Sequence, residues 1–529
     1  MSSDSSAEYD VIVVGSGAGL VGAYAAASRG LRTLVIEKTE FIGGTTAYSG
    51  AGIWLPGNAA EKRGGVNSGP DEARPYLDAI VGDDSPASLR ETFLQAGGPL
   101  IDELEKNPQF GQFFWLGVPD YFADAPNALQ DGRTIFPQDI ARSELGDLEP
   151  LVRRPLWTER WGDPVDETMS GGQALVARSL LAFVGTGNGT VLTNTALETL
   201  IVEDGAVVGV ETTSPEGEKK RFRASRGVLL ASGGFERNAE LRKNYEPLVG
   251  DTWTQGAPGN TGTALQAAMA IGAATDLLEE AWYAPGLVVP NTRPIFFTTV
   301  WSGIFVNSNG ERFMNERLPY DRAGHAILEE HRKPGVSAFP THWVFDQRQI
   351  DNERAFAGLP VNPQASGWFD AEKFTEAGVL TKADTLEELA EKLGLPVGAL
   401  IKTVDRFNDF ARSGVDEDFH RGETPWDQMI TKAVSPHTDG PNPCIGVIDQ
   451  GPFYSAQIVL SDLGTKGGVK TDERARVLNT EGEVIPGLYA SGNAMAPMSG
   501  RIYPGAGGPV GSSMVFSWVA ARDMAGEIA

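Results

Sequence analysis

The sequence predicts an α/β fold in which a Rossmann-like domain, with a parallel sheet and a β-meander, is interrupted by an inserted α+β domain. Three observations lead to this prediction. Residues 9–37 have the order strand, glycine turn, Ala-rich helix and strand that is typical of a βαβ unit. Short β-rich runs separated by turns follow one another over residues 189–225. The glycine-rich strands return in residues 461–529, after a stretch rich in aromatic residues and proline. We therefore expect one domain from residues 1–280 and 461–529, and an inserted domain from residues 281–460.

Length and charge restrict the classes of protein to which the chain can belong. Its 529 residues are enough for two to four domains and a large buried core. The formal net charge of −26 repels phosphate backbones and anionic lipid headgroups, so we expect no nucleic-acid partner. The 64 glycines follow no collagen-like period and indicate tight turns and close approaches of the backbone.

Cysteine content and hydropathy predict where the protein works. Cys444 is the single cysteine, which excludes an internal disulfide and favours a cytoplasmic location. The opening residues MSSDSSAE lack the basic start and apolar stretch of a secretory signal. A transmembrane helix needs about 18 consecutive apolar residues, and the sequence has no such run. Peripheral contact with the inner membrane stays open, because a folded apolar patch leaves no contiguous trace in a sequence.

The first βαβ unit predicts a dinucleotide site. The strand Tyr9–Val14 runs into the glycine turn GSGAGL, and Glu37 ends the second strand 22 residues after Gly15. The start of the helix favours a pyrophosphate, and an acidic residue at this distance accepts hydrogen bonds from ribose. Leu20 fills the third glycine position, so we expect looser packing of the helix on the strand. The alternative is a glycine turn without a ligand. The residues predicted to contact the dinucleotide here are Gly15, Ser16, Gly17, Ala18, Gly19, Glu37 and Lys38.

The next segment indicates which dinucleotide binds. Residues 41–56 form a loop dense in Gly, Thr and Ser. A nicotinamide enzyme ordinarily continues with another helix and strand, whereas flavoproteins often run such a loop along the diphosphate and flavin. The loop therefore favours FAD, and a plain surface loop is the alternative. The predicted contacts are Gly44, Thr45, Thr46, Ser49, Gly50 and Gly52.

The remaining elements follow in order. Residues 60–185 are expected to be mainly helical, and the β-meander begins at Gly189. An apolar strand then leads to Ser232 and Gly233, and a later one leads to Gly492 and Asn493. The last apolar segment, 510–524, is either a plain core helix or one whose start faces the flavin, and the two readings are compatible. The predicted cofactor contacts in these parts are Ser232, Gly233, Gly492, Asn493, Gly508, Pro509 and Val510.

These motifs, taken in order, cover nearly the whole chain and resemble flavoproteins of the fumarate reductase and 3-ketosteroid dehydrogenase class. The resemblance rests on GSGAG at 15–19, GGTT at 43–46, ASGGFE at 231–236, NGERFMNE at 309–316 and LYASGN at 488–493. Within the class, the sequences PDYFADAP, LPYDRAGH and RIYPGAGGPVG are similar to those of 3-ketosteroid Δ1-dehydrogenases. The resemblance implies an FAD-dependent oxidoreductase of steroid metabolism and degradation, with an FAD-binding domain made from both chain ends and an inserted catalytic domain.

The resemblance also implies roles for four residues. Tyr503 and the backbone N–H of Gly507 would bind the C3 carbonyl of the steroid, Tyr320 would remove a proton from C2, and Tyr121 would hydrogen-bond Tyr320. Hydride from C1 would go to flavin N5, and an external acceptor, with a quinone as one candidate, would reoxidise the flavin. The chemistry fits, because two donors on a carbonyl oxygen acidify the neighbouring C–H group. A free tyrosine of pKa ~10 is only about one-thousandth ionised at pH 7, so Tyr320 needs help as a base, and we expect activity on the alkaline side.

Several interpretations remain open at this stage. Any of the 11 tyrosines can be a half-buried core residue. A fumarate reductase-like enzyme would need cations, for which Arg312, Arg317, Arg322 and Arg501 are the candidates. The motifs are also compatible with a steroid desaturase acting at C4–C5 and with a flavin-carrying protein without catalysis. No metal site is expected, because the five histidines show no ligand spacing.

Overall fold

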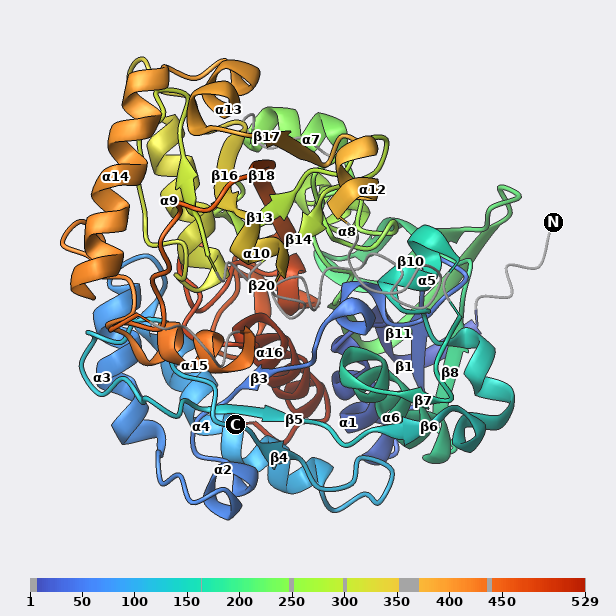
Figure 1. Cartoon of the computed structure of the whole chain (residues 1–529). Helices are drawn as coiled ribbons and strands as arrows, with labels where there is room; N and C mark the ends of the chain where they lie inside the picture. Colours follow the sequence, from blue (N-terminus) through green and yellow to red (C-terminus); the bar gives the residue numbers. More distant parts are fainter. Residues whose placement is uncertain are drawn as a thin grey trace. The chain divides into compact units, whose positions relative to one another are not determined.

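The computed structural model describes residues 7–162, 164–246, 252–297, 302–351, 371–434 and 440–528. The chain forms two compact units (Figure 1). Unit 1 comprises Met1–Asp251, Gly256–Ala281 and Gly464–Ala529, and unit 2 comprises Thr252–Gln255 and Trp282–Leu463. The predicted domain boundaries differ from these by a few residues and by Thr252–Gln255, and the tasks assigned to the two domains stay predictions. The first six residues of the opening polar segment lie outside the described residues.

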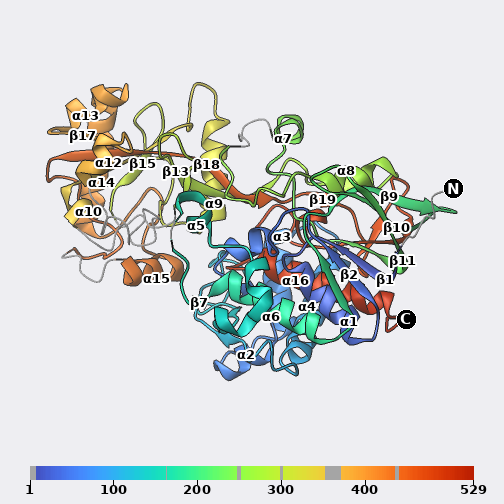
Figure 2. The same ribbon diagram turned by 90° about the vertical axis from the view of Figure 1, so that its right-hand side faces the viewer.

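Unit 1 contains an eight-stranded sheet. Six of its strands have the order β20-β21-β11-β1-β2-β8, while β10 pairs with β11 and β9 pairs with β10. Strands β21, β11, β1, β2 and β8 pair in parallel with their neighbours in this order. Several of these strands are visible in Figure 2. Their bounds are β1 Ala7–Val14, β2 Thr33–Ile36, β8 Gly189–Leu192, β9 Ala196–Glu203, β10 Ala206–Thr213, β11 Lys219–Leu230, β20 Arg476–Leu478 and β21 Val484–Ala490.

The predicted βαβ unit is confirmed. Strands β1 and β2 are parallel, and the helix α1 (Gly19–Ser28) connects them. Residues Val11–Val13 are fully buried without the alternation of a half-exposed strand, because a parallel strand of this kind is covered on both faces. The prediction that Leu20 loosens the packing of α1 on the strand is wrong. A Cβ on Gly19 would lie 2.5 Å from the Cβ of Ala231, so Gly19 makes the close approach that the third glycine position usually makes.

The predicted meander needs two corrections. The run at Gly189–Leu192 is not part of it, since β8 pairs in parallel with β2. The last β-rich run before residue 225 and the apolar strand that leads to Ser232 are one continuous strand, β11, rather than two. The first part of β11 pairs antiparallel with β10, and its last part pairs in parallel with β1. The antiparallel run is therefore β9-β10-β11.

The end of the chain completes the sheet, as the sequence predicts. Strand β21 pairs in parallel with β11, and the helix α16 (Gly508–Met524) packs against α1. The two helices approach closely at Gly22, where a Cβ would lie 2.7 Å from the carbonyl oxygen of Ser517. α16 starts at Gly508, two residues before the predicted start.

The helices and small sheets of unit 1 surround this framework. A three-stranded sheet, β3-β5-β4, connects residues near the loop 43–52 with residues 114–136. No helix within the described ranges is long and apolar enough to cross a membrane. The bounds are η1 Gly44–Tyr48, β3 Ile53–Trp54, α2 Ala59–Arg63, α3 Pro70–Val81, α4 Ala87–Leu104, β4 Phe114–Trp115, β5 Thr134–Phe136, β6 Ile140–Ala141, η2 Arg142–Leu151, α5 Leu156–Trp161, β7 Thr168–Met169, α6 Gly171–Gly185, α7 Ala239–Tyr245, α8 Thr263–Ala270, β12 Thr275–Asp276, β19 Gly468–Val469 and η3 Gly492–Ala494.

Unit 2 is built on a six-stranded sheet with the order β14-β13-β18-β16-β15, and β17 pairs with β18. Helices α13 and α14 contribute to an apolar core that also contains residues of β15 and β16. This is the α+β architecture expected for the inserted part. The bounds are β13 Ala281–Leu287, β14 Ile295–Phe296, β15 Ile304–Val306, α9 Tyr320–His331, β16 Thr341–Asp346, α10 Gln347–Asp351, α12 Ala371–Glu376, β17 Leu380–Ala383, α13 Leu386–Leu393, α14 Val397–Ser413, α15 Pro425–Val434 and β18 Phe453–Thr465.

Candidate active site

Four groups of predicted cofactor residues follow the carboxyl ends of four adjacent parallel strands. Residues 15–19 follow β1, residues 37–38 follow β2, residues 232–233 follow β11, and residues 492–493 follow β21. Because parallel strands end at the same edge of a sheet, these groups share one edge, which is where open α/β sheets bind ligands. The sheet therefore brings together segments that are up to 478 residues apart in sequence.

The turn after β1 has the geometry that the glycine pattern predicts. Gly15 has φ +101°, and a Cβ there would lie 2.4 Å from the carbonyl oxygen of Ala231. The Ser16 hydroxyl donates to the Glu37 carboxylate over 2.6 Å, and the Glu37 carboxylate also accepts the N–H and hydroxyl of Thr39 at 2.9 Å each. Glu37 is thus held at the end of β2 by its neighbours. The Lys38 ammonium donates to the Thr261 hydroxyl, and burial lowers the pKa of Lys38.

The Gly/Thr/Ser loop is joined to several parts of unit 1. The Thr45 hydroxyl accepts from the backbone N–H of Ala257 and from the side chain of Asn260, each at 2.9 Å. A Cβ on Gly17 would lie 2.8 Å from the Thr46 hydroxyl, and the Ser49 hydroxyl donates to the Thr46 carbonyl over 2.8 Å. The loop is therefore packed and hydrogen-bonded, which is not the behaviour of a plain surface loop.

The donor groups of unit 1 fit FAD. No side chain caps the N-terminus of α1 or of α16, and neither helix has an acidic residue in its first turn. Such helix starts favour phosphate or an electron-rich ring, because their N–H groups and dipoles point outward. The predicted acceptor for a ribose hydroxyl, Glu37, directly follows β2 at this edge, and Gly15 allows the close backbone approach that a pyrophosphate needs.

Sequence reasoning missed two side chains of this site. Asn260 bridges Thr45 and the buried Glu236, at 2.9 and 2.6 Å, and a Cβ on Gly233 would lie 2.9 Å from its side chain. The Gly/Pro-rich run APGN before it was the available signal. Arg153, which is 2% exposed, donates to Thr39 over 2.7 Å and so supports Glu37. Nothing in its sequence surroundings indicates this role. A cavity of about 470 Å³ lies there, lined by Thr39, Glu40, Phe41, Arg153, Glu159, Asn194 and Pro258.

Tyr503 and Gly507 lie together. The Gly507 N–H donates to the Tyr503 hydroxyl over 3.3 Å. Gly507 has φ +92°, and a Cβ there would lie 1.9 Å from the carbonyl oxygen of Gly52, so only glycine fits. Gly507 also forms the N-cap of α16, which directs the positive end of that helix toward the same place. Two donors 3.3 Å apart can both reach one acceptor oxygen.

Tyr121 belongs to the same part of unit 1. Its ring centroid lies 5.3 Å from that of Tyr503, with 33° between the ring planes. Both rings are buried, at 2% and 5% exposure. The backbone N–H of Tyr121 donates to the carbonyl of Pro504 over 3.2 Å. The structure thus brings three of the four predicted catalytic residues together.

Tyr320 lies in unit 2, at the first position of α9 and directly after Pro319. Its ring is half-buried and meets Phe296 edge-on, with 5.2 Å between the ring centroids. The predicted hydrogen bond between Tyr121 and Tyr320 joins residues of different units and stays a prediction.

Two of the cations required by the fumarate reductase-like alternative are already paired. Arg312 binds Glu316 and Asp416, at 2.8 and 2.7 Å. Arg501 binds Glu279 and Glu280, at 2.5 and 2.7 Å. Their charges are therefore compensated within the protein, which disfavours both as clamps for a dicarboxylate.

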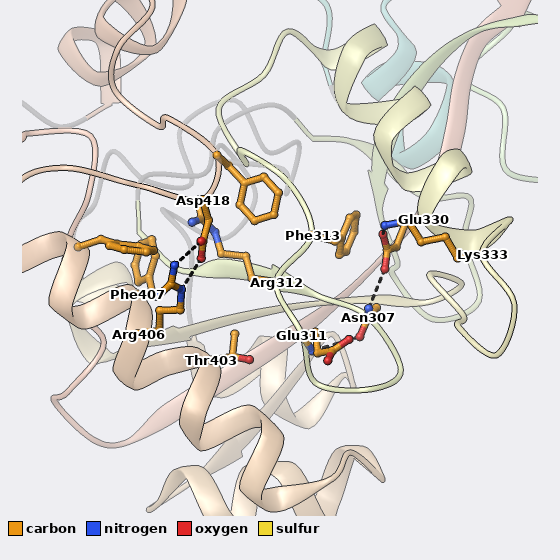
Figure 3. Close-up of a pocket in the computed structure, with 12 residues that line it drawn as sticks. Asn307, Glu311, Arg312, Phe313, Glu330, Lys333, Thr403, Arg406, Phe407 and Asp418 are labelled. Atoms are coloured by element: carbon orange, nitrogen blue, oxygen red, sulfur yellow. Dashed lines mark hydrogen bonds and ion pairs between the residues drawn. The ribbon is translucent and has the colours of Figure 1, made fainter.

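A cavity of about 340 Å³ in unit 2 contains none of the predicted cofactor contacts and none of the four predicted catalytic residues (Figure 3). Two ion pairs lie among its lining residues, Arg406 with Asp418 at 2.5 Å and Lys333 with Glu330 at 2.7 Å. The residues that line it are Asn307, Glu311, Arg312, Phe313, Glu330, Lys333, Thr403, Arg406, Phe407, Phe410, Asp418 and Phe419. The cations Arg312, Lys333 and Arg406 are all compensated by carboxylates of the protein, so we assign this cavity no function.

The part of the chain that the structure describes contains no group of three His, Cys, Asp or Glu side chains able to hold a metal ion. His437 lies outside the described residues. Cys444 is buried and lies 3.0 Å from the Thr431 hydroxyl.

Comparisons with known proteins agree on one group. The family model described as FAD binding domain matches residues 10–510. The chain is 40% identical to a 3-oxosteroid 1-dehydrogenase of Mycolicibacterium smegmatis, covering 99% of this chain and 98% of that protein. It is 39% identical to a 3-oxosteroid 1-dehydrogenase of Mycobacterium tuberculosis, covering 98% and 99%. The structure is similar to that of 3-ketosteroid Δ1-dehydrogenase from Sterolibacterium denitrificans in complex with 1,4-androstadiene-3,17-dione, with a TM-score of 0.89, 31% identity and coverage of 98% and 99%.

Proposed function

We propose that this chain, which belongs to the FAD binding domain family and to its 3-oxosteroid 1-dehydrogenases, is an FAD-dependent enzyme. The reaction that we propose introduces a double bond between C1 and C2 of 3-ketosteroids. Besides the family, one observation carries this proposal. The Gly507 amide and the Tyr503 hydroxyl form a pair of neighbouring donors at the start of α16. Such a pair suits a ketone oxygen.

The residues that would hold FAD are those at the shared edge of the sheet. The turn 15–19 would bind the pyrophosphate, Glu37 the ribose, and the segments 44–52, 232–233, 492–493 and 508–510 the remainder. When bound, FAD supplies the two-electron acceptor that takes up the hydrogen from C1.

The Tyr503 hydroxyl and the Gly507 N–H would both donate to the C3 carbonyl oxygen. As a proton leaves C2, negative charge develops on this oxygen, and the two donors together with the N-terminal dipole of α16 stabilise it. Both donors are fixed before the substrate arrives: Tyr503 is buried, and Gly507 is confined by Gly52. Preorganised donors cost no rearrangement during the reaction, so they act mainly on the transition state.

Tyr320 would accept the proton from C2. Its position at the start of α9 helps, because a negative charge in the first turn of a helix is stabilised by ~0.3–1 kcal/mol, and by up to ~2 kcal/mol in a partly buried site. The neighbouring Asp321 carboxyl acts in the opposite direction. A second phenol would therefore be useful, and Tyr121 would supply it by hydrogen bonding to the Tyr320 oxygen.

After each turnover the reduced flavin must be reoxidised, and we propose that an external molecule accepts its electrons. A quinone is the candidate, because it is lipophilic like the steroid substrate. We place the enzyme in the cytoplasm, on the ground that its single cysteine gives no sign of an oxidising compartment. Contact with the inner membrane would follow from a lipophilic substrate and a quinone acceptor.

Anaerobic titration of the purified protein with androst-4-ene-3,17-dione tests the proposed function. We expect the visible absorption band of the oxidised flavin to bleach, and the product to be the 1,4-diene-3-one. This substrate already has the C4–C5 double bond, so a desaturase acting at C4–C5 would leave the band unchanged. Succinate would bleach the band if the enzyme were fumarate reductase-like, and a flavin-carrying protein without catalysis would respond to neither compound.

A further inference from the structure

One buried hydroxyl joins the two segments that carry Tyr121 and Tyr503. Tyr76, in α3, is fully buried. Its hydroxyl donates to the carbonyl of Pro504 over 2.5 Å and accepts from the backbone N–H of Phe122 over 3.3 Å. Each of these partners is the chain neighbour of a proposed catalytic tyrosine. The Tyr76 hydroxyl therefore ties the backbone after Tyr121 to the backbone after Tyr503.

The same carbonyl has a second donor. The Tyr121 N–H reaches the Pro504 oxygen over 3.2 Å, so the Pro504 carbonyl accepts one hydrogen bond from the 121–122 segment and one from the Tyr76 hydroxyl. At the other end of the loop, the Thr134 hydroxyl donates to the carbonyl of Ala506 over 2.8 Å. Both fixed carbonyls lie between Tyr503 and Gly507, the two donors proposed for the ketone. The loop is thus held near each of them.

A buried group of side chains fixes Tyr76 itself. The Arg133 guanidinium lies 5.4 Å from the centre of the Tyr76 ring and 5.9 Å from that of Trp54. Arg133 forms an ion pair with Asp120, whose carboxylate also accepts the indole N–H of Trp54 over 2.8 Å. Arg133 and Asp120 are both fully or nearly fully buried, so the ring of Tyr76 has little freedom to move.

The hydroxyl keeps its proton over a wide pH range. Burial, with a contribution from the Asp120 carboxylate, raises the pKa of Tyr76 well above its ordinary value. It therefore still donates to Pro504 at the alkaline pH at which a phenolate base works best. An ionised phenol at this place would repel the carbonyl oxygen instead.

We infer that Tyr76 is a positioning residue of the reaction: its hydroxyl sets the spacing between the segments of Tyr121 and Tyr503, and so keeps the Tyr503 hydroxyl and the Gly507 amide directed at one oxygen. This inference rests on the proposed function. A role confined to core stability is the alternative, and it predicts a loss of stability without a specific effect on catalysis.

The variant Tyr76→Phe tests the inference, because it removes the hydroxyl and keeps the ring beside Arg133. Tyr489→Phe is the matched control. Tyr489 is also a buried tyrosine of unit 1, and its hydroxyl donates to Asp523 over 2.8 Å, away from the loop 503–507. Both proteins would be compared with the wild type in Tm, FAD content, kcat, KM and amide hydrogen exchange of residues 503–508.

In Tyr76→Phe, we expect the backbone amides of residues 503–508 to exchange several-fold faster than in the wild type. We expect kcat to fall about 10-fold with KM and FAD content nearly unchanged, because a small misplacement of the two donors acts on the transition state. Tyr489→Phe should change neither the exchange nor kcat. The inference is overturned if exchange in this segment is unchanged, if kcat is unchanged, or if both variants lose kcat in proportion to Tm.

The proposed function and the role of Tyr76 are tested by different measurements. If the wild type does not oxidise a 3-ketosteroid, the proposed function is wrong, and the kinetic part of the inference falls with it. The exchange measurement then still shows whether the Tyr76 hydroxyl holds the loop.

Discussion

The backbone N–H of Gly507 and the hydroxyl of Tyr503 lie 3.3 Å apart, with the amide donating to the phenol oxygen. The four-residue separation is possible because Gly507 has a left-handed backbone and no side chain, so the chain turns back beneath the Tyr503 ring and enters α16. In the proposed reaction, the two groups would exchange their mutual hydrogen bond for two bonds to one ketone oxygen.

Tyr503→Phe should lower kcat about 100- to 1,000-fold, which is the usual effect of removing one donor to a developing oxyanion. Gly507 would remain as the second donor, so activity should be measurable. Steady-state kinetics with an artificial electron acceptor would give the number, and the flavin spectrum would show that FAD is still bound. Turnover at the wild-type rate would contradict the assignment of Tyr503.

Gly507→Ala should cost both stability and activity. The left-handed φ alone costs about 1–3 kcal/mol for a non-glycine residue. The added Cβ would also meet the Gly52 carbonyl at 1.9 Å, so the loop must shift and kcat should fall at least about 100-fold.

Gly217→Ala separates these two costs, because Gly217 has φ +83° but open space around it. Denaturant unfolding should show the backbone cost in both variants, whereas only Gly507→Ala should lose kcat. Equal kcat values for the two variants would show that the clash of the added Cβ with Gly52 does not lower activity.

Tyr320→Phe and Tyr121→Phe test whether the two phenols act as a pair. We expect Tyr320→Phe to cause the larger loss, and the double variant to lose little more, since Tyr121 acts through Tyr320. The rate of the wild type should rise between pH 7 and pH 9, because a phenolate base becomes more populated with pH. Additive losses, or a rate that falls steadily over this range, would count against the pair.

Glu61→Gln tests a pH-dependent contribution to stability. Glu61 is fully buried in α2, where its carboxylate accepts the backbone N–H groups of Gly57 and Asn58. Burial raises the pKa of Glu61 from 4.5 to about 8. Between pH 4.5 and about pH 8, the folded state keeps a proton that the unfolded state has lost. The free energy of unfolding therefore falls as pH rises through this range, and it levels off above about pH 8.

The glutamine variant lacks this titration. Its Tm should therefore fall less than that of the wild type between pH 5 and pH 9. The variant should still fold, because its amide carbonyl can accept from the Gly57 N–H. Thermal unfolding at several pH values, with FAD present throughout, would measure the difference. Parallel Tm curves for the two proteins would show that Glu61 does not titrate in this range.

Local signals predicted the framework of unit 1 well. The strand at 9–14, the turn at Gly15 and the acidic Glu37 are all set by short-range patterns, and the structure has each of them in the predicted place. The same patterns failed at β8. A short β-rich run does not show which strand it joins, and the pairing of β8 with β2 joins residues 156 positions apart in sequence.

The site was predictable only in part, for a related reason. Motifs identified Tyr503, Gly507 and Tyr121, whose neighbours in sequence are distinctive. The residues that hold the loop 503–507, Tyr76 and Thr134, act through long-range hydrogen bonds and have no distinctive sequence surroundings. The same is true of Arg153, which supports Glu37 through Thr39. The relation of Tyr320 to the other tyrosines depends on two separate units, which no local pattern encodes.

The position of β21 between β20 and β11 affects how the protein is made. While the ribosome is still translating the insertion, β11 has already been synthesised with the edge that β21 will cover exposed, and an open strand edge invites pairing with other chains. That edge is closed only when β21 has been made, and α16 then packs against α1. A product truncated before residue 484 would lack the strand that covers β11, so it would be prone to aggregate rather than to accumulate as a half-active enzyme.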